Sequence, residues 1–179
     1  MIILCGPSAC GKSEIAKYLS HRYGIQKAVT STTREKRLNE TDHVDYHFFD
    51  EKTFRLLEEQ GAFVETATYN SHRYGCLKSE IAPNKAVILE PEGVGNFLKL
   101  NDPSLFIVVL TAEEKTRIDR MRYRKDKEAD IEKRIATDRS AFSEERLPFH
   151  HMKLATDGLT IDEAGDLVYR RYCEHLRSL

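Results

Sequence analysis

Residues 6–13 read Gly6-Pro7-Ser8-Ala9-Cys10-Gly11-Lys12-Ser13, a complete G-x-x-x-x-G-K-S phosphate-binding loop. An apolar run at residues 1–5 precedes the loop, and residues 14–19 follow it with helical spacing. This setting of buried strand, tight turn and helix N-terminus lets loop amides and the helix dipole hold an anion. The alternative is a chance match in a glycine-containing turn, which the flanking strand and helix argue against. The sequence therefore predicts a nucleoside triphosphate site.

The residues of the loop have distinct expected roles. The Lys12 ammonium would reach the β- and γ-phosphates, and the Ser13 hydroxyl would hold Mg²⁺. Cys10 lies where a helix N-terminus would lower the pKa of its thiol. We therefore expect oxidation or alkylation of Cys10 to block triphosphate binding. The residues expected to bind the triphosphate are Gly6, Ser8, Ala9, Cys10, Gly11, Lys12 and Ser13.

Composition is that of one globular domain, with 179 residues, 40% hydrophobic and 32% charged. A net charge of −1 gives no electrostatic reason to expect nucleic-acid binding. The chain starts on a core strand, which leaves no room for a signal peptide, and the apolar run at 105–110 is too short to span a bilayer. The cysteines form no C-x-x-C pair, which argues against a zinc site or disulfides. We therefore expect a cytoplasmic protein.

Short apolar strands alternate with amphipathic helices, which predicts an α/β fold with a parallel sheet covered on both faces. The expected strands lie at residues 27–30, 63–69, 86–89 and 105–110.

Helix boundaries follow from glycines and capping residues. A helix at 13–23 should end at Gly24, and Asp50 should cap a helix that ends before Gly61. Capping boxes at residues 111–114 and 160–163 predict two further helix starts. The last helix should turn one face to the core, made of Ile161, Ala164, Val168 and Tyr172.

Two stretches interrupt the alternation. Residues 31–77 are polar and rich in hydroxyls, arginines and aromatics, and residues 115–127 carry seven basic side chains against two acidic ones. In a phosphate-binding enzyme such insertions usually hold the second substrate and close over the first. For the basic stretch, an ordinary solvated helix and nucleic-acid binding are the alternatives. The adjacent His150 and His151 would not converge as metal ligands.

The rest of the chain discriminates among phosphate-loop proteins. Residues 84–87 read Asn-Lys-Ala-Val and lack the carboxylate of the Asn-Lys-x-Asp sequence with which regulatory GTPases read guanine. The chain does carry Thr30-Ser31-Thr32-Thr33-Arg34, followed by Arg37, Glu40, Asp45-Tyr46, Glu65 and Tyr74-Gly75. In order and spacing this pattern resembles the guanylate kinase family, almost without gaps as far as Gly75 and more loosely to the C-terminus.

The resemblance implies the three-layer fold of P-loop nucleoside monophosphate kinases in a single domain, residues 1–179. Its core would be residues 1–30, 78–114 and 136–179, with a monophosphate-binding insertion at 31–77 and a lid at about 115–135. The implied activity is ATP-dependent phosphorylation of GMP, and of dGMP, with Mg²⁺ as cofactor. The implied partners are ATP and GMP, with no nucleic acid or membrane, and the oligomeric state stays open.

The resemblance also implies residue roles. Glu65 would accept the guanine N1–H and N2–H₂ donors, whereas adenine would present an acceptor at N1. Arginines of the lid would close on the triphosphate. The implied acceptor site is Thr30, Arg34, Arg37, Tyr46, Glu65, Tyr74, Cys76 and Glu90, and the implied catalytic set is Lys12, Arg34, Arg120, Arg124 and Arg134. The alternatives are a solvated basic turn beside packed tyrosines, and a solvent-facing glutamate on a half-buried strand.

The chain departs from the family pattern at two places. Cys76 stands where the family usually has a serine near guanine O6, and residues 89–93 read Leu-Glu-Pro-Glu-Gly in place of L-D-I-D-x-Q-G. Glu90 or Glu92 would still order a magnesium-bound water or the acceptor ribose. Two rival functions stay open, namely a kinase of the same fold for another small phosphorylated acceptor and a non-catalytic protein-binding module.

Overall fold

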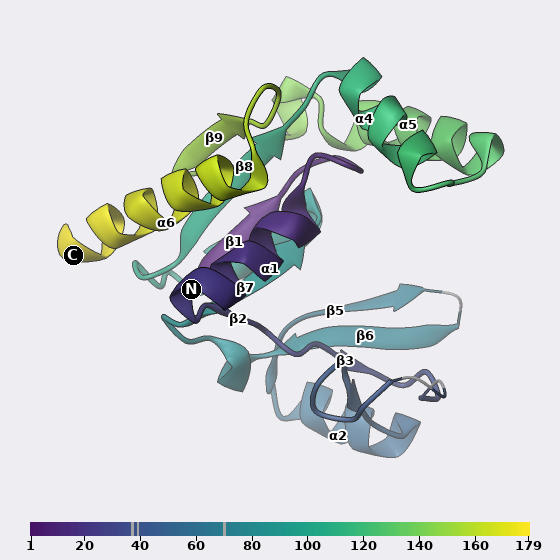
Figure 1. The fold of residues 1–179 in the computed structure, drawn as a ribbon. Coiled ribbons are helices and arrows are strands. Elements are labelled where there is room, and N and C mark those ends of the chain that lie inside the picture. Colours follow the sequence, from purple (N-terminus) through teal and green to yellow (C-terminus); the bar gives the residue numbers. More distant parts are fainter. Residues whose placement is uncertain (37, 39, 70) are drawn as a thin grey trace.

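Two β-sheets organise the chain in the computed structural model, which describes residues 1–36, 38, 40–69 and 71–179 (Figure 1). Within these residues the larger sheet has five strands in the order β2-β7-β1-β8-β9, and all of its pairs are parallel. The predicted α/β class with a parallel sheet is therefore confirmed. The strands are β1 (Ile2–Cys5), β2 (Gln26–Lys27), β7 (Lys85–Leu89), β8 (Phe106–Thr111) and β9 (Met152–Ala155).

Strand β1 is apolar without interruption because both faces of the sheet are covered. Ile2 and Leu4 join one buried cluster with residues of α1 (Lys12–Tyr23) and α6 (Ile161–Arg177). Ile3 and Cys5 join a second cluster with α3 (Pro91–Leu98), which packs on the opposite face. The alternation of side chains along one strand thus produces a three-layer arrangement.

Several predicted helix boundaries are confirmed. Helix α1 ends at Gly24, which has a φ of 68°. The Asp50 side chain accepts a hydrogen bond from Thr53 N at 2.6 Å and caps α2 (Glu51–Glu59). Thr160 and Glu163 form the predicted capping box at the start of α6.

Three sequence predictions are wrong in detail. Thr111 ends β8 and caps nothing, because Glu113 is the residue that precedes α4 (Glu114–Tyr123) and its N–H donates to the Asp157 carboxylate. The strand predicted at 27–30 stops at Lys27, after which the chain leaves the larger sheet. Ile161 is 37% exposed because it lies at the first turn of α6, before the helix reaches the core.

The second sheet has the order β4-β3-β6-β5 and is mixed, with β3 parallel to β4 and antiparallel to β6. Its core includes the rings of Phe54 on α2 and Phe63, whose centroids lie 4.5 Å apart. Figure 1 shows this sheet and α2 on the other side of the larger sheet from α4 and α5. The strands are β3 (Ser31–Thr32), β4 (His47–Phe48), β5 (Phe63–Tyr69) and β6 (His72–Leu77), and a 3₁₀ turn (Lys78–Glu80) follows.

Helices α4 and α5 (Glu128–Ala141) form a small core of their own, and a second 3₁₀ turn (Glu144–Arg146) follows α5. Met121, Ile131 and Ile135 are buried in it, and Ala9 of the phosphate loop packs against them. The basic stretch of the sequence is therefore attached to the loop. Among the described residues, no helix combines the length and apolar character that crossing a bilayer requires.

Candidate functional site

The phosphate loop joins β1 to α1, as the sequence predicts. Gly6 has a φ of 153°, and a Cβ atom there would lie 2.2 Å from the carbonyl oxygen of Leu110. Gly11 has a φ of 104°, again in the region that favours glycine. The loop conformation thus needs both glycines of the motif, and it directs the chain into the N-terminus of α1.

The Lys12 side chain folds over the loop. Its Nζ donates hydrogen bonds to the carbonyl oxygen of Pro7 at 2.8 Å and to that of Gly6. Ser13, the next residue, is exposed in the first turn of α1. An ammonium, an exposed hydroxyl and a helix N-terminus therefore occupy one small region, which suits a polyphosphate anion.

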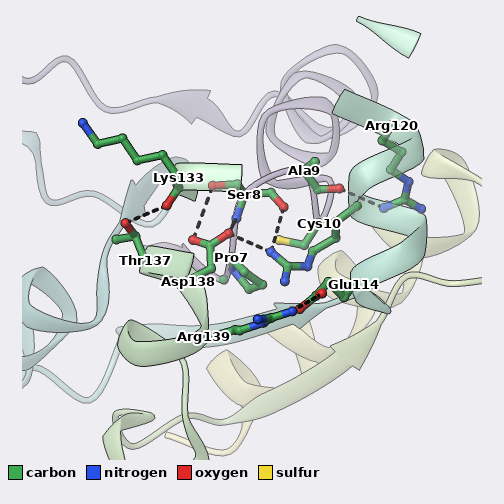
Figure 2. Close-up of polar contacts among 12 residues, drawn as sticks. Pro7, Ser8, Ala9, Cys10, Glu114, Arg120, Lys133, Thr137, Asp138 and Arg139 are labelled. Carbon is green, nitrogen blue, oxygen red and sulfur yellow. Dashed lines mark hydrogen bonds and ion pairs between the residues drawn. The ribbon is translucent and has the colours of Figure 1, made fainter. Parts of the chain in front are cut away.

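Side chains from outside the loop hold three of its consecutive residues, and Figure 2 shows the contacts of Ser8 and Ala9. The Ser8 N–H donates to Asp138 Oδ2 at 2.9 Å, and Arg120 Nη1 donates to the Ala9 carbonyl at 3.1 Å. The Thr156 hydroxyl donates to the carbonyl of Cys10 at 3.0 Å. Sequence reasoning missed Asp138 and Thr156, because these residues lie more than a hundred positions from the loop and follow no local pattern.

Cys10 behaves differently from the sequence expectation. Its thiol is fully buried, and this burial raises its pKa, although the nearby Lys12 acts in the opposite direction. Desolvation outweighs the attraction of the positive groups, so the predicted lowering of the pKa is wrong. The hypothesis that alkylation of Cys10 blocks triphosphate binding loses its chemical basis, because the thiol is neither ionised nor accessible.

A cleft of about 520 Å³ opens beside the loop. Arg120 and Arg124 reach it from the end of α4, and Tyr123 contributes a ring that is 89% exposed. Leu159 and the partly exposed Ile161 add apolar surface to the cleft. A cleft with a cationic end and an apolar wall suits a nucleotide. Its lining residues are Ala9, Gly11, Lys12, Ser13, Glu14, Arg120, Tyr123, Arg124, Leu159, Thr160 and Ile161.

Another pocket, of about 420 Å³, lies between the loop and α5. It contains Ser8, Glu90 and Arg134. Glu90 follows β7 and is exposed as a residue, yet desolvation of its carboxyl raises the pKa while the nearby Lys12 lowers it. A carboxylate thus faces the loop from the carboxyl end of a neighbouring parallel strand.

The predicted lid arginines lie on α4, α5 and the turn between them. Arg124 Nη2 and Arg134 Nη1 both bind Asp126 Oδ2, at 2.9 and 3.3 Å. Both arginines are half exposed, whereas Arg120 is held by the loop and by Thr156. Exposed pairs of this kind contribute little to stability, so both guanidinium groups are free to exchange a carboxylate for a phosphate.

Residues expected to hold a monophosphate gather on the second sheet. Arg34 forms an ion pair with Glu40 at 2.7 Å and lies over the ring of Tyr46, 5.5 Å from its centroid. The rings of Tyr46 and Tyr74 have centroids 6.2 Å apart. The structure therefore brings Arg34, Tyr46 and Tyr74 together, and Arg37 lies outside the described residues.

The strand register places Glu65 of β5 opposite Cys76 of β6. Glu65 is half-buried and accepts no hydrogen bond from the described residues, and burial together with Glu92 raises its pKa. Cys76 is fully buried, and its thiol donates only a weak bond to the carbonyl of Leu77 at 3.8 Å. Burial raises the pKa of Cys76 to about 12, so the thiol stays neutral. Thr30, another residue of the predicted acceptor site, accepts a hydrogen bond at its backbone carbonyl from the His47 N–H.

Comparison with known proteins settles which family has this geometry. The family model named guanylate kinase matches residues 1–164. The chain belongs to the guanylate kinase family. A guanylate kinase from Onion yellows phytoplasma (strain OY-M) is 35% identical over 152 residues, which cover 79% of this chain and 72% of the relative. A guanylate kinase from Thermotoga maritima is 34% identical over 139 residues, or 73% of this chain and 67% of the relative.

The fold of this guanylate kinase family chain is also found in solved structures. The crystal structure of guanylate kinase from Anaplasma phagocytophilum matches with a TM-score of 0.61 at 20% identity, covering 99% of this chain and 84% of that one. At this identity the likeness speaks for the fold alone. The predicted site residues of this family member form two groups, one around the phosphate loop and one on the second sheet.

Proposed function

We propose that the two groups of residues divide the family's reaction between them, with the phosphate loop holding ATP and the second sheet holding GMP. As a member of the guanylate kinase family over residues 1–164, the protein is an ATP-dependent GMP kinase. The observation that supports this division is Glu65, a half-buried carboxylate that no described residue binds. A carboxylate in that state is unfavourable unless a ligand supplies its hydrogen bonds.

The donor half consists of the loop and the adjoining cleft. Loop amides and Lys12 would hold the β- and γ-phosphates, and the adenosine would lie in the 520 Å³ cleft. Arg120 and Arg124 line that cleft, and the exposed ring of Tyr123 offers a surface for stacking. We assign residues 115–135, approximately, to the lid. The core then comprises residues 1–30, 78–114 and 136–179.

The acceptor half is the unit at 31–77. Arg34, with Arg37, would grip the monophosphate, because guanidinium forks match phosphate oxygens, and the hydroxyls of Tyr46 and Tyr74 would add neutral hydrogen bonds. Glu65 offers two acceptor oxygens to the adjacent N1–H and N2–H₂ donors of guanine. These contacts do not involve the ribose 2′-hydroxyl, so we expect dGMP to be a substrate too.

The residues around the loop also fit a magnesium ion. Mg²⁺ prefers oxygen ligands and keeps several waters, and the exposed Ser13 hydroxyl with the carboxylate of Glu90 or Glu92 supplies such a donor set. When bound, the ion neutralises charge on the β- and γ-phosphate oxygens.

Catalysis by this chain rests on positioning and charge. The acceptor phosphate is already an oxyanion, so no general base is needed. Lys12 belongs to the loop and Arg120 contacts it. Arg124 and Arg134 would turn from Asp126 towards the phosphates as charge spreads over the transferring group. Arg34 would contact the acceptor phosphate.

A coupled assay of ADP release tests the proposal, with ATP against GMP, dGMP, AMP, CMP and UMP. We expect turnover with GMP and dGMP and at least tenfold lower kcat/KM with the others. Preference for another monophosphate would overturn the role of Glu65. Calorimetry that detects no guanine nucleotide binding at millimolar concentration with magnesium would refute the proposed GMP site. The intact loop lysine already argues against a non-catalytic module.

A further inference from the structure

A buried ion pair reaches the phosphate loop from the helices that follow it in the sequence. Arg117 of α4 donates from Nη1 to Asp138 Oδ2 of α5 at 2.7 Å, and the two side chains are only 7% and 9% exposed. The ion pair binds all three polar groups of Ser8, namely its N–H, its hydroxyl and its carbonyl. The Ser8 N–H donates to Oδ2 at 2.9 Å, its hydroxyl donates to Oδ1 at 3.3 Å, and its carbonyl accepts from Arg117 Nη1 at 3.4 Å. Figure 2 shows Asp138 beside Ser8.

Stability alone does not account for this arrangement. Desolvation of two charges offsets much of their attraction, and apolar residues of similar volume often serve a protein equally well. Arg117 also buries its Nε atom, for which the described residues supply no hydrogen-bond partner. What an apolar pair could not provide is an acceptor for the Ser8 N–H.

We propose that Asp138, oriented by Arg117, is a positioning residue that presets the Ser8 peptide for triphosphate binding. The loop clasp is our term for Arg117, Asp138 and Ser8. By holding Ser8, the loop clasp restricts the backbone on the N-terminal side of Ala9, whose φ of 61° is left-handed. A loop held in its binding conformation loses less entropy when ATP arrives. This inference rests on the proposed donor role of the loop.

The test separates the loss of the hydrogen-bond acceptor for the Ser8 N–H from the loss of the ion pair. The variant Arg117→Leu/Asp138→Ala removes the pair without leaving an unpaired buried charge, and Arg117→Leu/Asp138→Asn restores one oxygen that accepts from Ser8. The matched control is Glu114→Ala/Arg139→Leu, because this more exposed pair joins the same two helices at 2.6 Å and its hydrogen bonds do not reach the loop.

We expect amide exchange of residues 8–11 in the ligand-free Leu/Ala variant to accelerate at least tenfold. Its KM for ATP should rise at least fivefold, and its KM for GMP should stay within twofold of wild type. In the Leu/Asn variant, loop exchange and the KM for ATP should both return most of the way to their wild-type values. The Glu114/Arg139 control should change neither quantity. Wild-type loop exchange in the folded Leu/Ala variant, or equal acceleration in the control, would overturn the proposal.

A readout on the wild-type protein covers the case in which the Leu/Ala variant does not fold. The Ser8 amide should exchange far more slowly than an unstructured peptide amide, and exchange at the peptide rate would refute the hydrogen bond to Asp138. Because exchange is measured without nucleotide, it reports on the loop clasp even if the wild type fails to phosphorylate GMP. The two failures are therefore distinguishable.

Discussion

Replacement of Glu65 by glutamine is the sharpest test of how the acceptor base is read. Glutamine has the same shape but offers one acceptor oxygen and an NH₂ group, which would face a guanine donor. One charged hydrogen bond is lost, worth about 1.5–3 kcal/mol, or about 10- to 150-fold in kcat/KM for GMP. The upper part of this range applies, because Glu65 is half-buried and no described residue competes for its oxygens.

The same substitution should stabilise the ligand-free protein. Burial and Glu92 raise the pKa of Glu65, so the folded state binds its proton more tightly than the unfolded state does. The free energy of unfolding therefore falls as pH rises from the ordinary glutamate value through the folded pKa, and the penalty is complete above it. Glutamine does not titrate, so the variant should melt higher than wild type at pH 7 and equally at pH 4 or below.

The measurements are a coupled assay with GMP and AMP, and thermal unfolding without nucleotide at several pH values. Glu59→Gln is the matched control, since Glu59 is an exposed carboxylate on the same unit and should leave both readouts unchanged. A GMP kcat/KM within threefold of wild type would show that Glu65 does not contact the base. A variant that melts lower at pH 7 would refute the electrostatic argument.

Three further changes test the donor half. Lys12→Ala should lower kcat by at least about 10²-fold, the scale of one transition-state contact, with an unchanged circular dichroism spectrum; kcat within a few-fold of wild type would remove Lys12 from catalysis. Gly6→Ala places a Cβ atom 2.2 Å from the carbonyl of Leu110, so denaturant unfolding should show a loss of about 1–3 kcal/mol, and full stability would mean that the loop relaxes freely. Tyr123→Ala should raise the KM for ATP about fivefold or more without lowering Tm, because the ring is 89% exposed and base stacking is worth about 1–3 kcal/mol; an unchanged KM would place the base elsewhere.

Much of the donor half, and several helix starts, could be read from the sequence because the information is local. The phosphate loop, the strand before it and the helix after it occupy one continuous segment, and the helix caps at Asp50 and Thr160 depend on neighbours three residues away. The mixed sheet at 31–77 was harder to predict. Its strands β3 and β4 have two residues each, too few to show a period.

Electrostatic properties depended on burial, which sequence position does not reveal. The motif suggested a reactive thiol at Cys10, and the packing around the loop reverses the direction of its pKa shift. In the same way, Arg117 counts in the sequence as one of seven cations, whereas the structure buries it against Asp138.

The sequence by itself predicted a phosphate site at residues 6–13, because the two glycines of the turn and the lysine and serine at the start of the following helix lie within eight consecutive residues. Only the tertiary structure decided what holds that loop. The hydrogen bond from Ser8 to Asp138 joins residues 130 positions apart, and the acid reaches the loop because α4 and α5 pack on Ala9. Contacts of that range arise from packing geometry, which no local pattern of residues encodes.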